Sequence, residues 1–238
     1  MSQARDSLTA RIRASYKEVL SRGFAASNGR PFEVVGVTKT FPVETVAAAY
    51  RAGLRNFGEN YADELIAKAS NPSLIFPSDP ITWHFVGAIQ SRKIVKLAPH
   101  VAVWHSVCRE KEIELIAAAS PDARVFIQVN FSDSQQRNGV RLPEASGLVN
   151  LCRVNGLQVL GLMVVPPVAD RESLGKMFAL VNKERLRLGL QGCSMGMSDD
   201  FELALANGST HIRVGRILFG NRSEMGELGS RMSQGGPE

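Results

Sequence analysis

The sequence has few of the features that mark secreted, membrane-spanning and metal-binding proteins. Its three cysteines, Cys108, Cys152 and Cys193, are odd in number and widely spaced, which fits neither a disulfide framework nor the close pairs of a zinc site. No apolar run approaches the roughly 18 residues of a membrane span, and residues 1–13 lack the hydrophobic stretch of an export signal. We therefore expect a soluble, cytoplasmic protein with buried thiols, no metal and no membrane partner.

The chain also has little excess charge of either sign. Its 28 lysines and arginines outnumber its 23 aspartates and glutamates by five, which is too dilute over 238 residues for a nucleic-acid-binding surface by itself. The positive sign still favours small anionic ligands. With 44% hydrophobic and 21% charged residues, the composition excludes a disordered or fibrous chain.

Short apolar runs alternate with helical patterns along the chain. A leading amphipathic helix is predicted over residues 4–27. The predicted strands cover residues 33–39, 54–58, 83–87, 101–107, 125–130, 157–165, 193–197 and 211–215. The predicted helices between them cover residues 43–52, 61–69, 91–97, 110–119, 172–188 and 201–208. Near-continuous apolar strands that alternate with helices are typical of a parallel sheet covered on both faces.

At this length, eight such strands favour an α/β fold of the closed (β/α)8 TIM-barrel type. An open, doubly wound sheet is the alternative, but its G-x-G-x-x-G motif is absent after the first strand, where the chain reads VTKTFP. We expect a single barrel domain over residues 1–223, with residues 1–30 as its leading helix. Residues 224–238, rich in glycine and serine, are expected to form a flexible tail.

Lys39 stands at the end of the first predicted strand, the position where TIM barrels carry their ligand sites. Burial lowers the pKa of an amine and frees its lone pair, so Lys39 is a candidate nucleophile toward a carbonyl. The alternative is a lysine whose stem packs on the protein while its ammonium group reaches water.

The ends of the last two predicted strands carry candidate anion-binding groups. Ser198 precedes a predicted helix, and Gly215 begins the loop after the last strand; phosphate sites of this fold use both places. Alternatively, Ser198 or Asp199 only caps the helix. Arg213 alternates with apolar neighbours, so we expect its side chain to face the barrel interior and to meet a carboxylate, a carbonyl oxygen or a ligand.

Two histidines and a basic segment are more weakly informative. His84 and His105 lie in apolar strands and are interpreted as hydrogen-bonded core histidines rather than metal ligands. The segment 90–96, QSRKIVK, is interpreted as the solvated face of a helix, with a docking patch as the alternative.

Taken together, these strand ends resemble the pyridoxal-phosphate homeostasis protein family, whose members are similar to the barrel domain of alanine racemase. The resemblance covers roughly residues 34–222. It rests on the motifs VTKTFPVE, GLRNFGENYADEL, WHFVGAIQSRK, HSVCREK, QVNFSDSQQRNG, GLMVVPP, SMGMSDDFELALANGST and IRVGRILFGNR. Each motif is weak alone, but in this order and spacing the set is highly specific.

The resemblance implies that pyridoxal 5′-phosphate forms an aldimine on Lys39. It implies that Asn60 of the GEN motif lines the cofactor and that Arg213 faces the pyridine nitrogen. An arginine there donates to an unprotonated nitrogen and leaves the ring a weak electron sink, whereas an aspartate would keep the nitrogen protonated.

The resemblance also implies a phosphate site. Ser198 matches a phosphate-contacting serine, and Gly215 and Arg216 match the phosphate loop after the last strand. Arg216 stands where the family usually has threonine, so a backbone amide and a charged side chain replace a hydroxyl contact.

Alanine racemases use a tyrosine of a second domain as their second acid/base group. We expect no such domain here, and the three tyrosines, Tyr16, Tyr50 and Tyr61, fall in predicted helices. The resemblance therefore implies a protein of vitamin B6 homeostasis without catalytic residues or efficient racemase turnover. We expect a monomer that has apo enzymes as recipients of the cofactor and does not bind nucleic acid.

Three alternatives remain open. The first is a pyridoxal-phosphate-dependent amino-acid racemase or decarboxylase, and the second is a phosphate-ester enzyme without this cofactor. The third is an RNA-binding module that uses the basic patch at residues 92–96.

Overall fold

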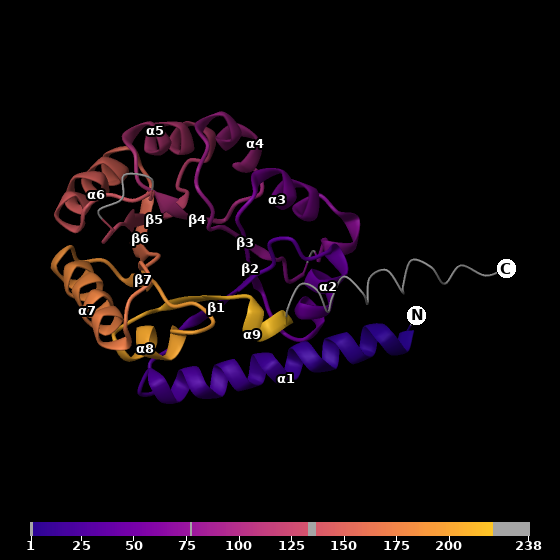
Figure 1. The fold of residues 1–238 in the computed structure, drawn as a ribbon. Helices are drawn as coiled ribbons and strands as arrows, with labels where there is room; N and C mark the ends of the chain where they lie inside the picture. Colours follow the sequence, from indigo (N-terminus) through magenta and orange to yellow (C-terminus); the bar gives the residue numbers. More distant parts are fainter. Residues whose placement is uncertain (1, 77, 133–136, 221–238) are drawn as a thin grey trace.

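The sheet closes into an eight-stranded parallel barrel, with helices around its outside (Figure 1). The computed structural model describes residues 2–76, 78–132 and 137–220. The strands are β1 (Glu33–Val37), β2 (Asn56–Glu59), β3 (Thr82–Phe85), β4 (Val103–Val107), β5 (Arg124–Val129), β6 (Gln158–Val164), β7 (Gly192–Ser194) and β8 (His211–Val214). Each strand pairs with the next, and β8 pairs with β1. The predicted TIM barrel is therefore confirmed.

All the α-helices except the first and the last lie between consecutive strands, as the right-handed crossovers of parallel strands require. The α-helices are α1 (Ser2–Ala26), α2 (Val43–Arg51), α3 (Ala62–Ala69), α4 (Ile94–Leu97), α5 (Glu110–Ala119), α6 (Ala145–Val154), α7 (Arg171–Arg187), α8 (Phe201–Ala206) and α9 (Arg216–Phe219). Three short 3₁₀ helices are η1 (Pro72–Leu74), η2 (Ser91–Lys93) and η3 (Leu142–Glu144). The predicted helix at 91–97 is thus divided into η2 and α4.

Among the α-helices, the sequence predicted neither the four-residue α9 nor the longer α6. Pro143 precedes it and Gly147 lies inside it, and both residues lower helix propensity. The helix forms because Leu148, Val149 and Cys152 are buried where it packs on β5 and β6. Tertiary packing outweighs local propensity here.

Apolar side chains fill both the barrel and the layer between strands and helices. All five residues of β4 are buried, as expected for a strand covered on both faces. Inside the barrel, Val103, Phe126 and Met163 form a small cluster separate from the larger outer core. The same interior holds several buried polar side chains described below, which makes it unusual for a barrel core.

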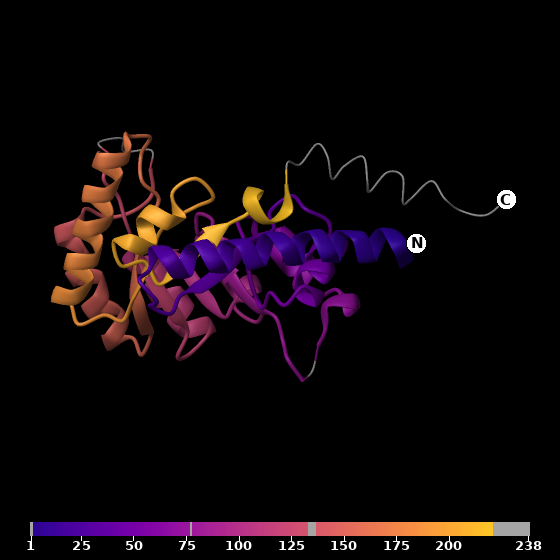
Figure 2. The same cartoon turned by 90° about the horizontal axis from the view of Figure 1, so that it is seen from below.

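Helix α1 runs along one side of the barrel, next to α2, α8 and α9, as Figures 1 and 2 show. Its side chains Ile12 and Val19 are fully buried against the barrel. Arg22 donates to both carboxylate oxygens of Glu202 in α8, at 2.9 and 3.2 Å. The predicted leading helix is confirmed, and it braces the first and last elements of the barrel.

Cys152 and Cys193 are buried, Cys108 is half-buried, and all three are free thiols. Burial raises the pKa of both Cys152 and Cys193 to about 12. In the part of the chain that the structure describes, no helix is both long and apolar enough to cross a membrane. The predicted tail at 224–238 lies outside the described residues.

Candidate functional site

A cavity of about 660 Å³ opens where β1, β2, β7 and β8 end. Its apolar lining includes Val37, Phe41 and Val165. The cavity also holds the six candidate residues that the sequence singled out: Lys39, Asn60, Ser198, Arg213, Gly215 and Arg216. The structure therefore brings all six together, from segments far apart in the chain. The role of each toward a ligand remains a prediction.

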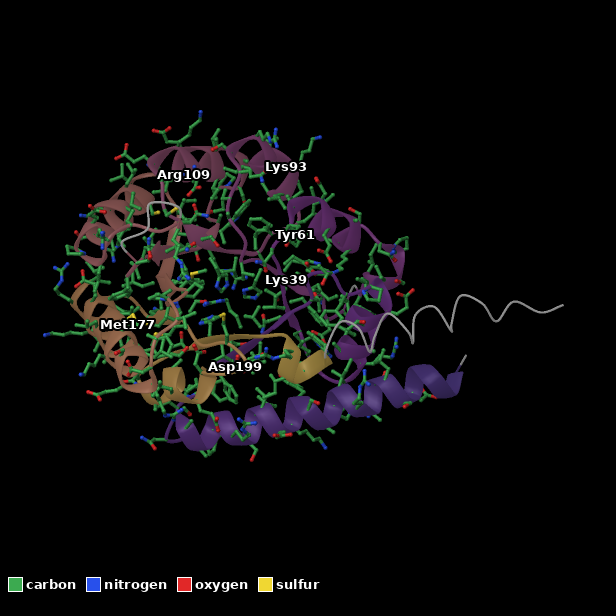
Figure 3. All side chains as sticks on the ribbon, in the orientation of Figure 1. Lys39, Tyr61, Lys93, Arg109, Met177 and Asp199 are labelled. Carbon is green, nitrogen blue, oxygen red and sulfur yellow. The ribbon has the colours of Figure 1, made fainter. Side chains whose placement is uncertain are left out.

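Lys39 lies on a strained turn directly after β1. Thr38 donates its backbone N–H to Gly58 O at 3.0 Å, and Phe41 donates to Thr38 O at 3.0 Å, which closes the turn. Thr40 has a φ of +65°, a left-handed conformation that is uncommon for a β-branched residue. Such strain persists only where the surroundings hold it, and it is typical of functional sites. Lys39 is half-buried and lies within the ring of helices (Figure 3).

A cluster of charged and polar side chains is hydrogen-bonded to the backbone of this turn. We call Thr38, Glu59, Glu64 and Lys68 the ionic cluster. Lys68 donates its three ammonium hydrogens to Glu59 Oε1, Glu64 Oε1 and Thr38 O, each at 2.7 Å. Thr38 Oγ1 donates to Glu59 Oε1 at 2.7 Å, and the N–H of Thr40 donates to Glu64 Oε1 at 2.6 Å. The cluster thereby fixes the backbone on both sides of Lys39.

Glu59 and Lys68 are among the most deeply buried charged residues of the described chain. Glu59 is fully buried and Lys68 is 4% exposed. Burial raises the pKa of Glu59, and the neighbouring Lys68 ammonium and Thr38 hydroxyl oppose that rise. Among the described residues, Glu59 Oε2 has no hydrogen-bond partner. An uncompensated charge here would be costly, so the ion pair depends on both partners.

Glu59 and Lys68 were not predicted from the sequence. A signal was present: Glu59 directly follows the largely apolar predicted strand at 54–58 and closes β2 after two buried residues, and Lys68 lies three residues after the buried Leu65 on the inner face of α3. A charged residue on a buried helical face points to a buried partner.

Arg213 faces the barrel interior, as predicted, and is 5% exposed. Its Nη1 donates to Ser194 Oγ at 2.6 Å and its Nη2 donates to Val164 O at 2.8 Å. Both acceptors are neutral oxygens, so of the expected partners these contacts include a carbonyl oxygen but no carboxylate. Burial lowers the pKa of Arg213 to about 10, against the opposing charge of Asp200. The guanidinium group is therefore cationic at neutral pH.

The loops after β7 and β8 meet at the other end of the cavity. Ser198 Oγ accepts from the backbone N–H of Ile217 at 3.4 Å, and the exposed Arg216 is paired with Asp199. The alternative in which Ser198 or Asp199 caps the following helix is wrong. Helix α8 begins at Phe201, and its preceding residue Asp200 instead accepts from the N–H of Met197.

Asn60 follows β2 and lines the cavity beside Lys39. The loop after β3 approaches it closely, since a Cβ atom on Gly87 would lie 1.9 Å from Asn60 O. Only glycine fits there. Tyr61 does not lie in α3 as predicted, because its backbone is extended at the residue before the helix. It is exposed and lines a neighbouring cavity of about 120 Å³.

His84 and His105 are hydrogen-bonded core histidines, as interpreted from the sequence. Among residues 2–76, 78–132 and 137–220, no group of three or more His, Cys, Asp or Glu side chains could hold a metal ion. The basic segment is partly neutralised, because Lys93 pairs with Asp63 on the outer ring (Figure 3). The cavity thus offers an amine, a buried guanidinium group and hydroxyl and guanidinium groups at its outer end.

Comparisons with known proteins identify the family of this chain. Residues 25–223 match the family described as "Alanine racemase, N-terminal domain". The "Pyridoxal phosphate homeostasis protein" of Pseudomonas aeruginosa is 37% identical over 212 residues, which cover 84% of this chain and 90% of that protein. The human protein of the same name is 32% identical over 209 residues, which cover 79% of this chain and 76% of that protein.

Solved structures show the same architecture. PipY of Synechococcus elongatus, solved with pyridoxal phosphate bound, has a TM-score of 0.76 and 29% identity over 88% of this chain and 100% of its own. Alanine racemase of Enterococcus faecalis has a TM-score of 0.67 and 15% identity, over 92% of this chain and 59% of its own. The second likeness bears on the fold alone.

Proposed function

The chain belongs to the pyridoxal phosphate homeostasis protein family, and from that membership we propose that it binds pyridoxal 5′-phosphate as an aldimine on Lys39. One observation carries the proposal: an amine, a buried arginine and the two loops after β7 and β8 line a single cavity. The protein then acts in intracellular vitamin B6 homeostasis, by holding the cofactor reversibly.

The donor set fits this cofactor. Pyridoxal phosphate needs an amine for its aldehyde, an anchor for its phosphate and a partner for its ring nitrogen. Lys39 would supply the amine, Ser198 and the backbone around Gly215 the phosphate anchor, and Arg213 the ring partner. Arg216 is able to add a charged phosphate contact once it exchanges its present partner Asp199. When bound, the cofactor supplies an aldehyde and an electron-withdrawing ring.

Arg213 favours retention of the cofactor over turnover. Its guanidinium group is cationic at neutral pH and is held by neutral acceptors, so toward the ring it acts only as a hydrogen-bond donor. A donor partner keeps the ring nitrogen unprotonated, and an unprotonated ring withdraws electrons weakly.

The positions of the tyrosines also favour retention of the cofactor over turnover. None of Tyr16, Tyr50 and Tyr61, all within the described part of the chain, lines the cavity of Lys39. Tyr50 stacks on Phe76 and donates its hydroxyl to Asp79 O at 2.8 Å. An efficient racemase needs an acid/base group on each face of its substrate. We assign no catalytic residue to this chain.

We further propose that residues 1–223 form one domain, that the protein is a cytoplasmic monomer, and that apo enzymes requiring the cofactor receive it. These statements follow from the family membership. They are separable from cofactor binding and need their own measurements of mass in solution and of transfer.

The test is the absorbance spectrum of the purified protein with added pyridoxal phosphate, before and after borohydride, followed by mass mapping. We expect an imine band that borohydride removes, with the added mass on Lys39. Lys39→Ala should lose the band and the label. Lys17→Ala is the matched control, since Lys17 lies on α1, far from the cavity lining.

Two results would contradict the proposal. A label spread over surface lysines, or an unchanged band in Lys39→Ala, would remove Lys39 from its role. Chiral inversion of an added amino acid at a rate abolished by Lys39→Ala would favour the racemase alternative instead.

A further inference from the structure

A continuous line of hydrogen bonds crosses the barrel from Arg213 at the cavity to Glu33 at the opposite end of the strands. Its middle members come from β7, β4, β3 and β2, and all but the last are nearly or fully buried. We call these four residues the histidine chain: Ser194, His105, His84 and Asn56. No part of the proposed cofactor site requires them to touch a ligand.

The cavity end is compatible with one direction along the line, which the far end then determines. A guanidinium group has only donors, so Arg213 Nη1 donates to Ser194 Oγ at 2.6 Å. Ser194 still has its own hydroxyl hydrogen to donate to His105 Nδ1, at 2.8 Å. Because His105 accepts at Nδ1, its proton lies on Nε2, which points to His84 Nδ1 at 2.8 Å.

The far end requires the same direction. Glu33 is a carboxylate and only accepts, so Asn56 Nδ2 donates to Glu33 Oε2 at 2.8 Å. The other amide atom, Asn56 Oδ1, must accept from His84 Nε2, at 3.1 Å. His84 thus carries its proton on Nε2 and accepts on Nδ1 from His105. The two ends, one cationic and one anionic, specify the same tautomer for both histidines.

Burial enforces this arrangement. Ser194 and His105 are fully buried and His84 is 2% exposed, so water cannot substitute for a lost partner. A protonated imidazole has no acceptor, and it would break the contact at Nδ1. Burial lowers the pKa of His84 to about 3, with His211 and Arg124 adding repulsion, and it lowers the pKa of His105 well below the usual range.

We propose that the histidine chain positions Arg213. By accepting from Nη1, Ser194 holds the guanidinium plane in one orientation. The line of neutral dipoles toward Glu33 supports the positive charge, and no carboxylate of the described residues is hydrogen-bonded to the guanidinium group. Ser194, His105 and His84 are positioning residues for the ring-nitrogen partner. This inference rests on the proposed function, in which Arg213 faces the cofactor ring.

The tautomers can be measured without any cofactor. In the ¹⁵N-histidine-labelled protein, two-bond ¹H–¹⁵N correlations should show His84 and His105 as neutral Nε2–H tautomers throughout about pH 5 to 8. Detection of an Nδ1–H tautomer at either residue, or of its titration in that range, would overturn the inference.

The positioning role is tested on the cofactor-loaded protein. His105→Leu should weaken retention of pyridoxal phosphate about tenfold, the equivalent of one buried hydrogen bond, and shift the absorbance maximum of the bound cofactor. His105→Gln, which keeps a donor and an acceptor, should restore part of both. His211→Leu is the matched control and should change retention less than twofold. His211 is another largely buried barrel histidine, and among the described residues its ring is hydrogen-bonded to Thr210 Oγ1 and not to the histidine chain.

The outcomes separate the two proposals. If His105→Leu folds, labels on Lys39 and retains the wild-type affinity and spectrum, the histidine chain does not position Arg213, although the proposed function stands. If the wild-type protein takes up no cofactor, the proposed function fails and this inference fails with it. If His105→Leu does not fold, Ser194→Ala takes its place, because it removes the single acceptor that joins Arg213 to the chain.

Discussion

The two sides of the cavity rest on buried polar networks that manage charge in different ways. In the ionic cluster beneath Lys39, opposite charges touch: the Lys68 ammonium lies 2.7 Å from two carboxylates. In the histidine chain beneath Arg213, the unlike charges stand at opposite ends of the barrel and neutral groups join them. The first network holds a strained turn by local compensation, whereas the second keeps a cation exposed to the ligand without neutralising it.

The difference predicts where each network is vulnerable. Removing one partner of a buried ion pair lowers the free energy of unfolding strongly, because the other charge stays buried without a counter-ion. A chain of neutral groups loses one hydrogen bond at a time, but it cannot accept a proton. Four variants or conditions test this contrast.

Lys68→Met should have the largest effect, with a loss of about 3–5 kcal/mol in the free energy of unfolding, since Glu59 would remain buried without a counter-ion. Urea unfolding measures it. The control is Lys176→Met, whose ion pair with Glu172 is exposed, and whose loss should be about 0.5 kcal/mol or less. Equal losses in the two variants would contradict local compensation. The double variant Glu59→Gln/Lys68→Met should recover part of the stability.

Lowering the pH should also reduce the free energy of unfolding. The pKa of His84 is lowered to about 3 and that of His211 to about 4, whereas the unfolded chain binds these protons near pH 6.5. Their contribution to stability is therefore complete above about pH 6.5 and declines as the pH falls toward the folded values, by about 1.4 kcal/mol per pH unit for each histidine. Unfolding measured from pH 7 to about 4.5 should show a shallower decline in His84→Gln than in the wild type. An identical slope would mean that His84 titrates normally.

Thr40→Gly should raise the free energy of unfolding by up to about 1 kcal/mol, because glycine adopts the left-handed conformation without the Cβ clash. Thr40→Ala keeps the Cβ atom and should bring no such gain. If alanine stabilises as much as glycine does, then the side chain of Thr40, and not its backbone, is the source of the strain.

Glu33→Gln should have the smallest effect on stability, within about 0.5 kcal/mol, because the side chain is exposed at the end of the barrel. The variant is useful because it tests what sets the tautomer of His84. A neutral amide no longer fixes the orientation of Asn56, so the His84 signal should broaden or divide. An unchanged His84 spectrum would show that Glu33 does not determine the direction of the hydrogen bonds in the histidine chain.

The fold and the lining of the cavity were predictable because they depend on local patterns. Largely apolar strands such as β4, whose five residues are all buried, indicate burial on both faces of the sheet. Lys39 and Arg213 occupy positions at or near strand ends, where this fold binds its ligands. Helix α6 was missed because its stability comes from packing on β5 and β6, against unfavourable local propensity.

The two networks were not predictable, because the register of the strands determines which buried side chains come into contact. His105 and Ser194 are 89 residues apart, and their contact depends on how β4 and β7 face each other across the barrel. Sequence could state that a buried histidine needs a partner, but not which one. The same holds for Glu59, whose partners Thr38 and Lys68 lie directly after β1 and in α3.

The cavity lies at the seam where β1 meets β8, with Val35 in register with Arg213. Lys39 leaves the ribosome well before Arg213, so a nascent chain that has not completed β8 has only part of the binding site. Ligand capture is thereby reserved for chains whose barrel is complete, and each captured ligand favours a closed ring over an open one by mass action.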